Sequence, residues 1–248
     1  MSRSRSRPSS AEPRRSPLTP FYAILGLVAL AGLGILAYQM FGRSEGATAP
    51  VQVAVDPQAA SRAQGIALGP EDAPVVIYEF ADFQCYGCAQ FASLTMPVVK
   101  ERFVDTGMVR YVFYDYPLVS IHPNAFLAAR AGRCANEQGR FWPYHDRLFQ
   151  QQGRWSTERN PSGMFVDYAR QLGLDAGAFE GCLRSDRFAA EVTQSMALAE
   201  SLGVQGTPTL FVNGKRLQDV PSASELDRII REEMGGAGTA APAAPASE

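Results

Sequence analysis

Two of the four cysteines in this chain, Cys85 and Cys88, lie three positions apart. Residues three apart on a helix have Cβ atoms about 5 to 6 Å from each other, so the two sulfurs can form and break a disulfide with small side-chain rotations. The first turn of a helix has unpaired backbone N–H groups and the positive end of the helix dipole, which favour a thiolate on Cys85. The pair therefore predicts thiol-disulfide chemistry with one activated sulfur.

A Cys-x-x-Cys pattern has two other common uses, half of a zinc site and a structural bridge that never opens. A zinc site needs two more ligands at close spacing, and the remaining cysteines, Cys134 and Cys182, stand alone in the sequence. We therefore expect no metal and no other cofactor. Of the three possible pairings, we favour Cys85 with Cys88 and Cys134 with Cys182.

The elements around this pair are a strand before it and a helix after it. Residues 75–80 are rich in β-branched and aromatic side chains, which is typical of a buried strand. The helix begins near Cys85 and is expected to reach about Val104, with a kink at Pro97. Residues 108–116 form a second β-rich run, and the helix between the two runs allows them to lie parallel in a βαβ unit.

A long helical region separates this unit from a second β-rich part. Residues 121–202 have helical patterning throughout, and the β signal returns at residues 209–212. Asn213-Gly214 is a strong hairpin signal, and a final helix is expected over residues 222–234. The folded unit, residues 65–234, is thus predicted to be an α/β domain with a large all-helical insertion. The helices of the insertion are expected to begin near residues 122, 141, 160, 175 and 186.

Cys134 and Cys182 fall on two of the predicted helices of the insertion. A disulfide between them would close a loop of nearly fifty residues, which is worth about 4 kcal/mol in the loop-entropy estimate. The alternative is a second redox pair that relays electrons. Neither cysteine has an adjacent cysteine or an activating group in the sequence, so we expect a structural bridge.

The N-terminal part of the chain predicts a membrane anchor. Residues 21–41 contain no charged residue and are about as long as a helix that crosses a bilayer. Arginines precede this segment and few basic residues follow it, which indicates a cytoplasmic N-terminus. A cleaved signal peptide is the alternative, because Ala47-Thr48-Ala49 fits the cleavage pattern. In both cases the domain would lie in the periplasm or another extracytoplasmic space, where disulfides persist.

The segments that flank the anchor and the domain have compositions that do not form a core. Residues 1–20 are predicted to be a disordered basic tail in the cytoplasm, and residues 42–64 a linker. The Gly/Ala/Pro-rich residues 235–248 are predicted to be a second disordered tail. The formal net charge of −2 gives no reason to expect nucleic acid as a partner.

The chain resembles the thioredoxin superfamily and, within it, the DsbA-like thiol-disulfide oxidoreductases, including their membrane-tethered bacterial members. The resemblance covers about residues 68–234. It depends on the Cys-Tyr-Gly-Cys motif after a strand, the helical insertion, Thr207-Pro208 before a hairpin strand, and the terminal helix. It implies a thioredoxin fold with a large helical insertion, preceded by one transmembrane helix.

The resemblance also implies roles for single residues. Cys85 would be the exposed nucleophile that forms the mixed disulfide, and Cys88 the buried resolving thiol. Pro208 would be a cis-proline that faces the disulfide, with Thr207 offering backbone hydrogen bonds to an extended substrate. An ordinary trans proline at the start of a strand is the alternative.

An acidic residue stands where many members of this superfamily carry a buried acid. Glu79 lies six residues before Cys85 in an otherwise apolar strand, and an acid there is costly unless it has a partner or a function. A pKa raised by desolvation would let Glu79 exchange the proton of Cys88. A solvated Glu at the edge of the sheet is the alternative. Asp82 is expected to be a turn or capping residue.

The sequence departs from the family between its cysteines. DsbA itself has Pro-His there, whereas this chain has Tyr86 and Gly87, which we expect to lie beside bound substrate. Without that histidine, a strongly oxidising potential is not assured. The only two histidines, His122 and His145, both lie in the predicted insertion, where we expect ordinary surface or core residues.

The resemblance predicts an oxidase that introduces disulfides into exported proteins. We expect a monomer that acts on reduced proteins or peptides and is reoxidised by a quinone-linked membrane partner of the DsbB or vitamin K epoxide reductase type. Two alternatives stay open. One is a disulfide reductase or isomerase, and the other is a tethered peptide-binding or chaperone module whose disulfide is structural.

Overall fold

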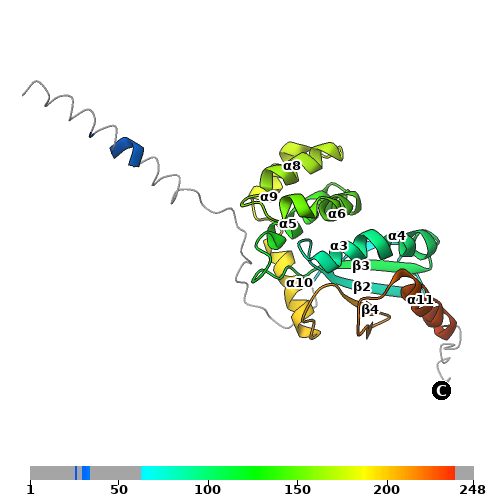
Figure 1. Cartoon of the computed structure of the whole chain (residues 1–248). Helices are drawn as coiled ribbons and strands as arrows, with labels where there is room; N and C mark the ends of the chain where they lie inside the picture. Colours follow the sequence, from blue (N-terminus) through cyan, green and yellow to red (C-terminus); the bar gives the residue numbers. More distant parts are fainter. Residues whose placement is uncertain (1–25, 27–29, 34–62, 238–248) are drawn as a thin grey trace, which may run out of the picture. The chain divides into compact units, whose positions relative to one another are not determined.

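The computed structural model describes Gly26, residues 30–33 and residues 63–237 of the chain. The chain divides into two units, Met1–Gly46 and Ala47–Glu248, and the described residues of the first unit are helical (Figure 1). Within the described part, we find no helix with the length and apolarity needed to cross a membrane.

Several predictions for the ends of the chain therefore lie outside the described residues. They concern most of the membrane segment, the cytoplasmic tail, most of the linker and most of the C-terminal tail. These remain predictions, as does the alternative of a cleaved signal peptide.

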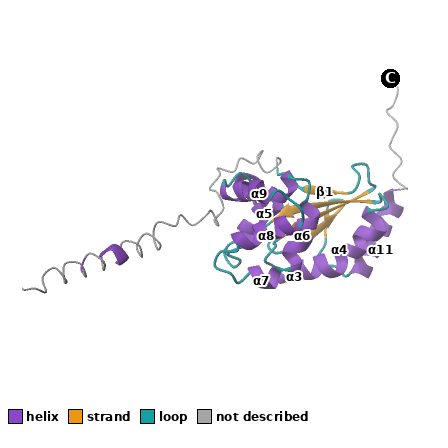
Figure 2. Ribbon diagram, turned by 90° about the horizontal axis from the view of Figure 1, so that it is seen from above, coloured by secondary structure: helices purple, strands orange, loops and turns teal. Residues whose placement is uncertain are grey.

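One mixed sheet forms the centre of residues 63–237 (Figure 2). Its strand order is β1-β3-β2-β4-β5; β2 and β3 are parallel, whereas β1, β4 and β5 each run antiparallel to their neighbours. The prediction that the first two β-rich runs pair in parallel is confirmed. The strands are β1 (Ile66–Leu68), β2 (Val75–Ala81), β3 (Val109–Asp115), β4 (Thr209–Val212) and β5 (Lys215–Arg216).

The two faces of this sheet carry different helices. Successive side chains of a strand point to opposite faces, and in β2 Val75 and Ile77 pack into the core beneath the helix that follows Cys85. Phe80 points to the other face, where it packs with Ala199 of α10 (Ala189–Ser201). Glu79 has the parity of Val75 and Ile77, so β2 directs it toward the helix of the Cys-x-x-Cys motif.

The helix after Cys85 continues to Val104, as predicted, but not as a regular α-helix. It contains two π-helical segments, and Pro97 stands at the start of the α-helical turn that follows the first of them. A residue without an N–H is accommodated where the i→i−4 bonding pattern is already interrupted. The segments are α3 (Tyr86–Gln90), η1 (Phe91–Thr95), α4 (Met96–Val99) and η2 (Lys100–Val104).

The predicted insertion between the two halves of the sheet is confirmed as all-helical. Residues 116–208 are all described and contain helices but no strand. A disulfide between Cys134 and Cys182 joins α5 (Ala125–Glu137) to α9 (Ala176–Arg184), and both cysteines are buried. Besides these two helices and α10, the insertion contains α6 (Phe141–Gln150), α7 (Gln152–Trp155) and α8 (Ser162–Gln171).

The C-terminal part returns to the sheet through a tight hairpin. Asn213 and Gly214 both have positive φ, as a two-residue hairpin of this kind requires, and they join β4 to β5. Helix α11 (Ala223–Ala237) follows, and the Ser222 hydroxyl accepts the N–H of Glu225 in its first turn at 3.3 Å. Helix α11 packs against α4 on the face of the sheet that carries the Cys-x-x-Cys helix.

Candidate active site

The two motif cysteines lie at the N-terminus of α3 with different exposures. Cys85 is the N-cap residue, has extended backbone angles and is half-buried, whereas Cys88 is inside the first turn and 0 % exposed. Both are free thiols. Cys85 is thus the sulfur that a second molecule can reach, and Cys88 is the sulfur behind it.

The loop before β4 lies against this pair. The Thr207-Pro208 peptide bond is cis, so the alternative of a trans proline is wrong. The Cys85 thiol lies 3.3 Å from the carbonyl oxygen of Thr207, and a Cβ placed on Gly87 would be 3.4 Å from Cδ of Pro208. Tyr86 is 72 % exposed beside them. The structure therefore brings together the cysteines and all four residues that the sequence assigned to substrate binding.

The surroundings of the two sulfurs separate their pKa values. The pKa of Cys85 is lowered to about 5, first by the hydrogen bond from the Cys88 thiol and then by the Thr207 side chain and the N–H groups of Cys88 and Gly87; partial burial opposes this. Burial raises the pKa of Cys88 well above that of an ordinary thiol. At neutral pH the site holds an accessible thiolate next to a protonated buried thiol.

Alkylation of the reduced protein should report this low pKa directly. Cys85 reacts as the thiolate, so its rate with iodoacetamide should rise through about pH 5 and be level by pH 7. A free cysteine would still be gaining reactivity near pH 8.5. In Cys88→Ala, which removes the largest stabilising hydrogen bond, the midpoint should move up toward the ordinary value. A wild-type midpoint above pH 8 would contradict the proposed activation.

Glu79 lies buried beneath the cysteine pair. It is 2 % exposed, so the alternative of a solvated Glu at the sheet edge is wrong. The Tyr111 hydroxyl of β3 donates to Oε2 of Glu79 at 2.5 Å, and Oε1 has no hydrogen-bond partner within the described residues. Burial raises the pKa of Glu79 to about 7, against the lowering effect of Tyr111 and with a smaller rise from the charge of Cys85. An acid with this pKa suits proton exchange near neutral pH.

Tyr111→Phe tests the hydrogen bond to this acid without changing the ring. Loss of the donor should raise the pKa of Glu79 further, by about one pH unit, because a hydrogen bond to a charged group favours the charged form. The carboxyl resonance of Glu79 in a pH titration measures the change. Tyr114→Phe, in the same strand but on the opposite face, is the matched control and should leave the Glu79 titration where it was.

Hydrogen bonds between the insertion and the turn before Cys85 hold this turn in place. The Gln152 amide of α7 donates to the carbonyl oxygens of Phe83 and Cys85 at 2.7 and 2.9 Å. The Gln84 side chain accepts the N–H of Asn124 and donates to the carbonyl oxygen of Ser156, at 2.8 and 2.9 Å. Single glutamines in helical segments have no distinguishing sequence pattern, so sequence analysis did not identify this contact.

The two histidines have different surroundings. His145 is 1 % exposed, lies among aromatic rings that include Phe83 and Phe113, and has Nδ1 2.9 Å from a carboxylate oxygen of Asp146. This is a core histidine, as predicted. His122 instead contacts Asp82, three residues before Cys85. Asp82 accepts the N–H of Gln84 and so forms the predicted turn.

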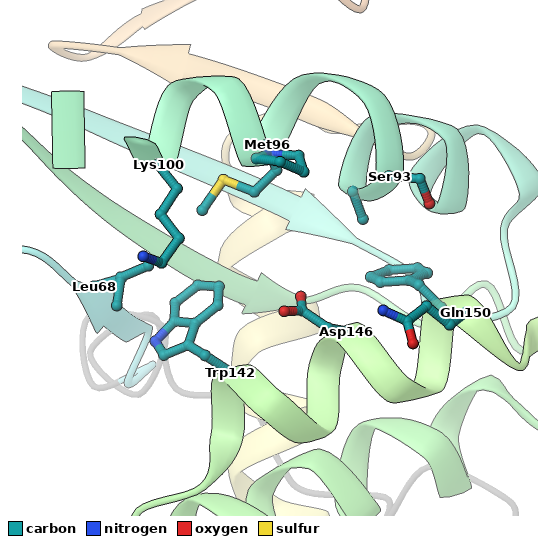
Figure 3. Close-up of a pocket in the computed structure, with 10 residues that line it drawn as sticks. Leu68, Ser93, Met96, Lys100, Trp142, Asp146 and Gln150 are labelled. Atoms are coloured by element: carbon teal, nitrogen blue, oxygen red, sulfur yellow. The ribbon is translucent and has the colours of Figure 1, made fainter. Parts of the chain in front are cut away.

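A separate pocket lies on another side of the motif helix. It has a volume of about 280 Å³ between the η1-α4 region and α6, with Trp142, Met96, Lys100 and Asp146 around it (Figure 3). Neither Cys85 nor Pro208 lines it, so it is distinct from the redox site. Among the described residues, no group of three or more His, Cys, Asp or Glu side chains could hold a metal ion.

Comparisons with known proteins agree with this geometry. The family model described as "Thioredoxin" matches residues 61–232. Disulfide bond formation protein D of Bacillus subtilis is 30% identical over 173 residues, which are 68% of this chain and 77% of that protein. The crystal structure of oxidised BdbD from Bacillus subtilis has a TM-score of 0.63 and 28% identity, and the match covers 68% of this chain and 92% of that one.

A further group of relatives carries the similarity inside a longer protein. The Na(+)/H(+) antiporter NhaA 3 of Salinispora tropica is 39% identical over 180 residues, which are 73% of this chain but 25% of the antiporter. The chain therefore spans about a quarter of the length of the antiporters that it matches.

Proposed function

Because this chain belongs to the thioredoxin family and is a DsbA-like thiol-disulfide oxidoreductase, we propose that it is an oxidase that introduces disulfides into exported proteins through Cys85 and Cys88. The observation that carries the direction is the place of Cys85 at the N-cap of α3, where the Cys88 thiol and the N–H groups of Cys88 and Gly87 lower the pKa of Cys85 to about 5. A stabilised thiolate stabilises the reduced enzyme relative to its disulfide. That difference makes the disulfide form a strong oxidant.

The reaction moves two electrons from substrate to enzyme. A substrate thiolate attacks Sγ of Cys85 in the oxidised pair; the Cys85–Cys88 bond breaks, a mixed disulfide forms, and Cys88 leaves with the electron pair and is then protonated. A second thiolate of the substrate then attacks the substrate sulfur that is bound to Cys85. Cys85 leaves as the stabilised thiolate, and the substrate holds a disulfide.

The buried acid has a defined place in this cycle. When the Cys88 thiolate forms, Glu79 in its protonated form is the proposed proton donor, and it takes the proton back when the pair is reoxidised. Its pKa of about 7 lets it act in both directions near neutral pH. Tyr111 holds one carboxyl oxygen and leaves the other without a partner within the described residues.

We propose the substrate groove, the compartment and the redox partner on the same basis. The Thr207-Pro208 loop, with Tyr86 and Gly87 opposite, would bind an extended reduced segment by main-chain hydrogen bonds. The domain would act outside the cytoplasm, anchored by residues 21–41. A quinone-linked membrane protein of the DsbB or vitamin K epoxide reductase type would accept the two electrons and restore the disulfide.

The reduction potential of the full chain tests the direction of the reaction. Equilibration with glutathione redox buffers should give a reduction potential of about −120 mV if the protein is an oxidase. The reduction potential of a reductase would be about −270 mV. The readout is the ratio of the dithiol to the disulfide form of the Cys85–Cys88 pair, measured after the free thiols have been alkylated. A pair that does not cycle at any buffer potential would instead support the peptide-binding module.

A further inference from the structure

Asp82 contacts both motif cysteines through its backbone. Its carbonyl oxygen accepts the N–H of Cys85 at 3.0 Å, and its own N–H donates to Sγ of Cys88 at 3.5 Å. Asp82 is 1 % exposed and lies between the end of β2 and the start of α3. Any shift of its backbone would therefore move a hydrogen-bond donor away from the buried sulfur.

The side chain of Asp82 is held by three donors. Oδ1 accepts the N–H of Gln84 at 2.7 Å, and Oδ2 accepts the N–H of Leu118 at 2.8 Å. Oδ2 also lies 2.7 Å from Nδ1 of His122, and since a carboxylate only accepts, the imidazole donates. His122 lies in the segment between β3 and α5, and its side chain is 21 % exposed. A partly exposed imidazole of the insertion thus reaches a buried residue whose backbone binds the sulfur of Cys88 and the N–H of Cys85.

We propose that His122 is a positioning residue of the redox site, which acts through Asp82 to fix the backbone N–H that stabilises Cys88 when this sulfur leaves as a thiolate. The inference rests on the proposed disulfide exchange at Cys85 and Cys88, in either direction of electron flow.

The leaving sulfur depends on this hydrogen bond more than the attacked sulfur does. Attack on Sγ of Cys85 sends the electron pair to Sγ of Cys88. This sulfur is buried, and burial disfavours the negative charge of its thiolate. The Asp82 N–H acts against that penalty and lowers the pKa of Cys88. A thiol of lower pKa leaves faster, so loss of this donor should slow the opening of the disulfide.

The reactivity of Cys85 in the reduced protein has other causes. Its thiolate is stabilised by the Cys88 thiol, by the Thr207 side chain and by N–H groups of Cys88 and Gly87, none of which His122 contacts by a hydrogen bond. Loss of His122 should therefore separate two reactions that a general loosening of the site would slow together.

The experiment measures both reactions in the full chain at pH 7. Stopped-flow mixing of the oxidised protein with dithiothreitol reports the departure of Cys88, and iodoacetamide alkylation of the reduced protein reports the Cys85 thiolate. In His122→Leu the first rate should fall about tenfold, the effect of a lost hydrogen bond to a charged group, and the second should stay within about twofold. His122→Asn, whose amide can still donate to Asp82, should recover most of the first rate.

A neighbouring substitution and a second variant complete the design. Ile121→Ala changes an exposed side chain of the same loop, 66 % exposed, and should leave both rates unchanged. Asp82→Asn weakens the same contact from the other partner and should reproduce the split, so the test does not depend on the folding of His122→Leu alone.

The possible outcomes distinguish this inference from the proposed function. If wild-type protein exchanges with dithiothreitol and His122→Leu keeps its rate, or loses both rates equally, the positioning role is wrong and the oxidoreductase assignment stands. If the wild-type disulfide itself does not react, the proposed function fails, and this inference fails with it.

Discussion

Cys88→Ser is expected to accumulate a covalent enzyme-substrate complex, and Cys85→Ser to lose activity by at least about three orders of magnitude. Serine at 88 cannot form the Cys85–Cys88 disulfide. The Cys85 thiolate instead attacks a disulfide of an oxidised substrate and displaces one substrate thiolate, and without the Cys88 thiol to attack Sγ of Cys85 the mixed disulfide persists. Serine at 85 removes the sulfur that is attacked, and the buried Cys88, 0 % exposed, cannot replace it. The opposite results of two isosteric changes follow from the different burial of the two sulfurs.

Oxidative refolding of a reduced substrate protein measures the loss of activity in Cys85→Ser. Non-reducing electrophoresis, after Cys88→Ser has been mixed with a disulfide-bonded substrate, detects the trapped complex. Ser93→Ala, an exposed residue of the same helix, is the control and should refold the substrate at the wild-type rate. Unchanged refolding by Cys85→Ser, or mixed disulfides through Cys88 in that variant, would contradict the assignment of the nucleophile.

The parts of the fold that could be predicted from sequence are those with a repeating local pattern. The apolar run of β2, the Asn213-Gly214 turn and the long helical stretch each repeat a signal over enough residues to identify an element. Strand β1 has three residues and α7 has four, too few to show a period. The π-helical segments were also missed, because the periodic pattern of apolar residues does not distinguish i→i−5 from i→i−4 bonding over five residues.

The candidate site divides in a similar way between local and distant contacts. The cysteine motif and Glu79 are identified by spacing within one strand-helix unit. The hydrogen bonds of Tyr111 to Glu79 and of His122 to Asp82 join residues 32 and 40 positions apart, and the sequence has no local signal for either. Sequence analysis therefore identified the groups that react, and the structure identified the groups that position them.

Removal of the Cys134–Cys182 disulfide is expected to destabilise the domain without slowing the chemistry at Cys85. The bridge joins two residues with a sequence separation of 48, and the loop-entropy estimate for a loop of that length is about 4 kcal/mol of stabilisation. This is a large part of the free energy of unfolding of a typical domain, which is about 5 to 15 kcal/mol. Cys134→Ala combined with Cys182→Ala avoids leaving a free buried thiol. Urea unfolding of this double variant should show a lower midpoint and a steeper slope, because the denatured chain without the cross-link exposes more surface.

The same double variant decides between a structural bridge and an electron relay. Both sulfurs are buried, with 1 % and 2 % exposure, so neither is placed to meet a substrate directly. Dithiothreitol exchange at Cys85 and Cys88, measured well below the unfolding midpoint, should keep the wild-type rate. Cys85→Ala with Cys88→Ala is the matched control, and its unfolding midpoint should stay close to that of the reduced wild-type pair. If loss of the Cys134–Cys182 bridge leaves stability intact but slows multiple turnover, the bridge is a relay, and the insertion takes part in electron transfer rather than in holding the site.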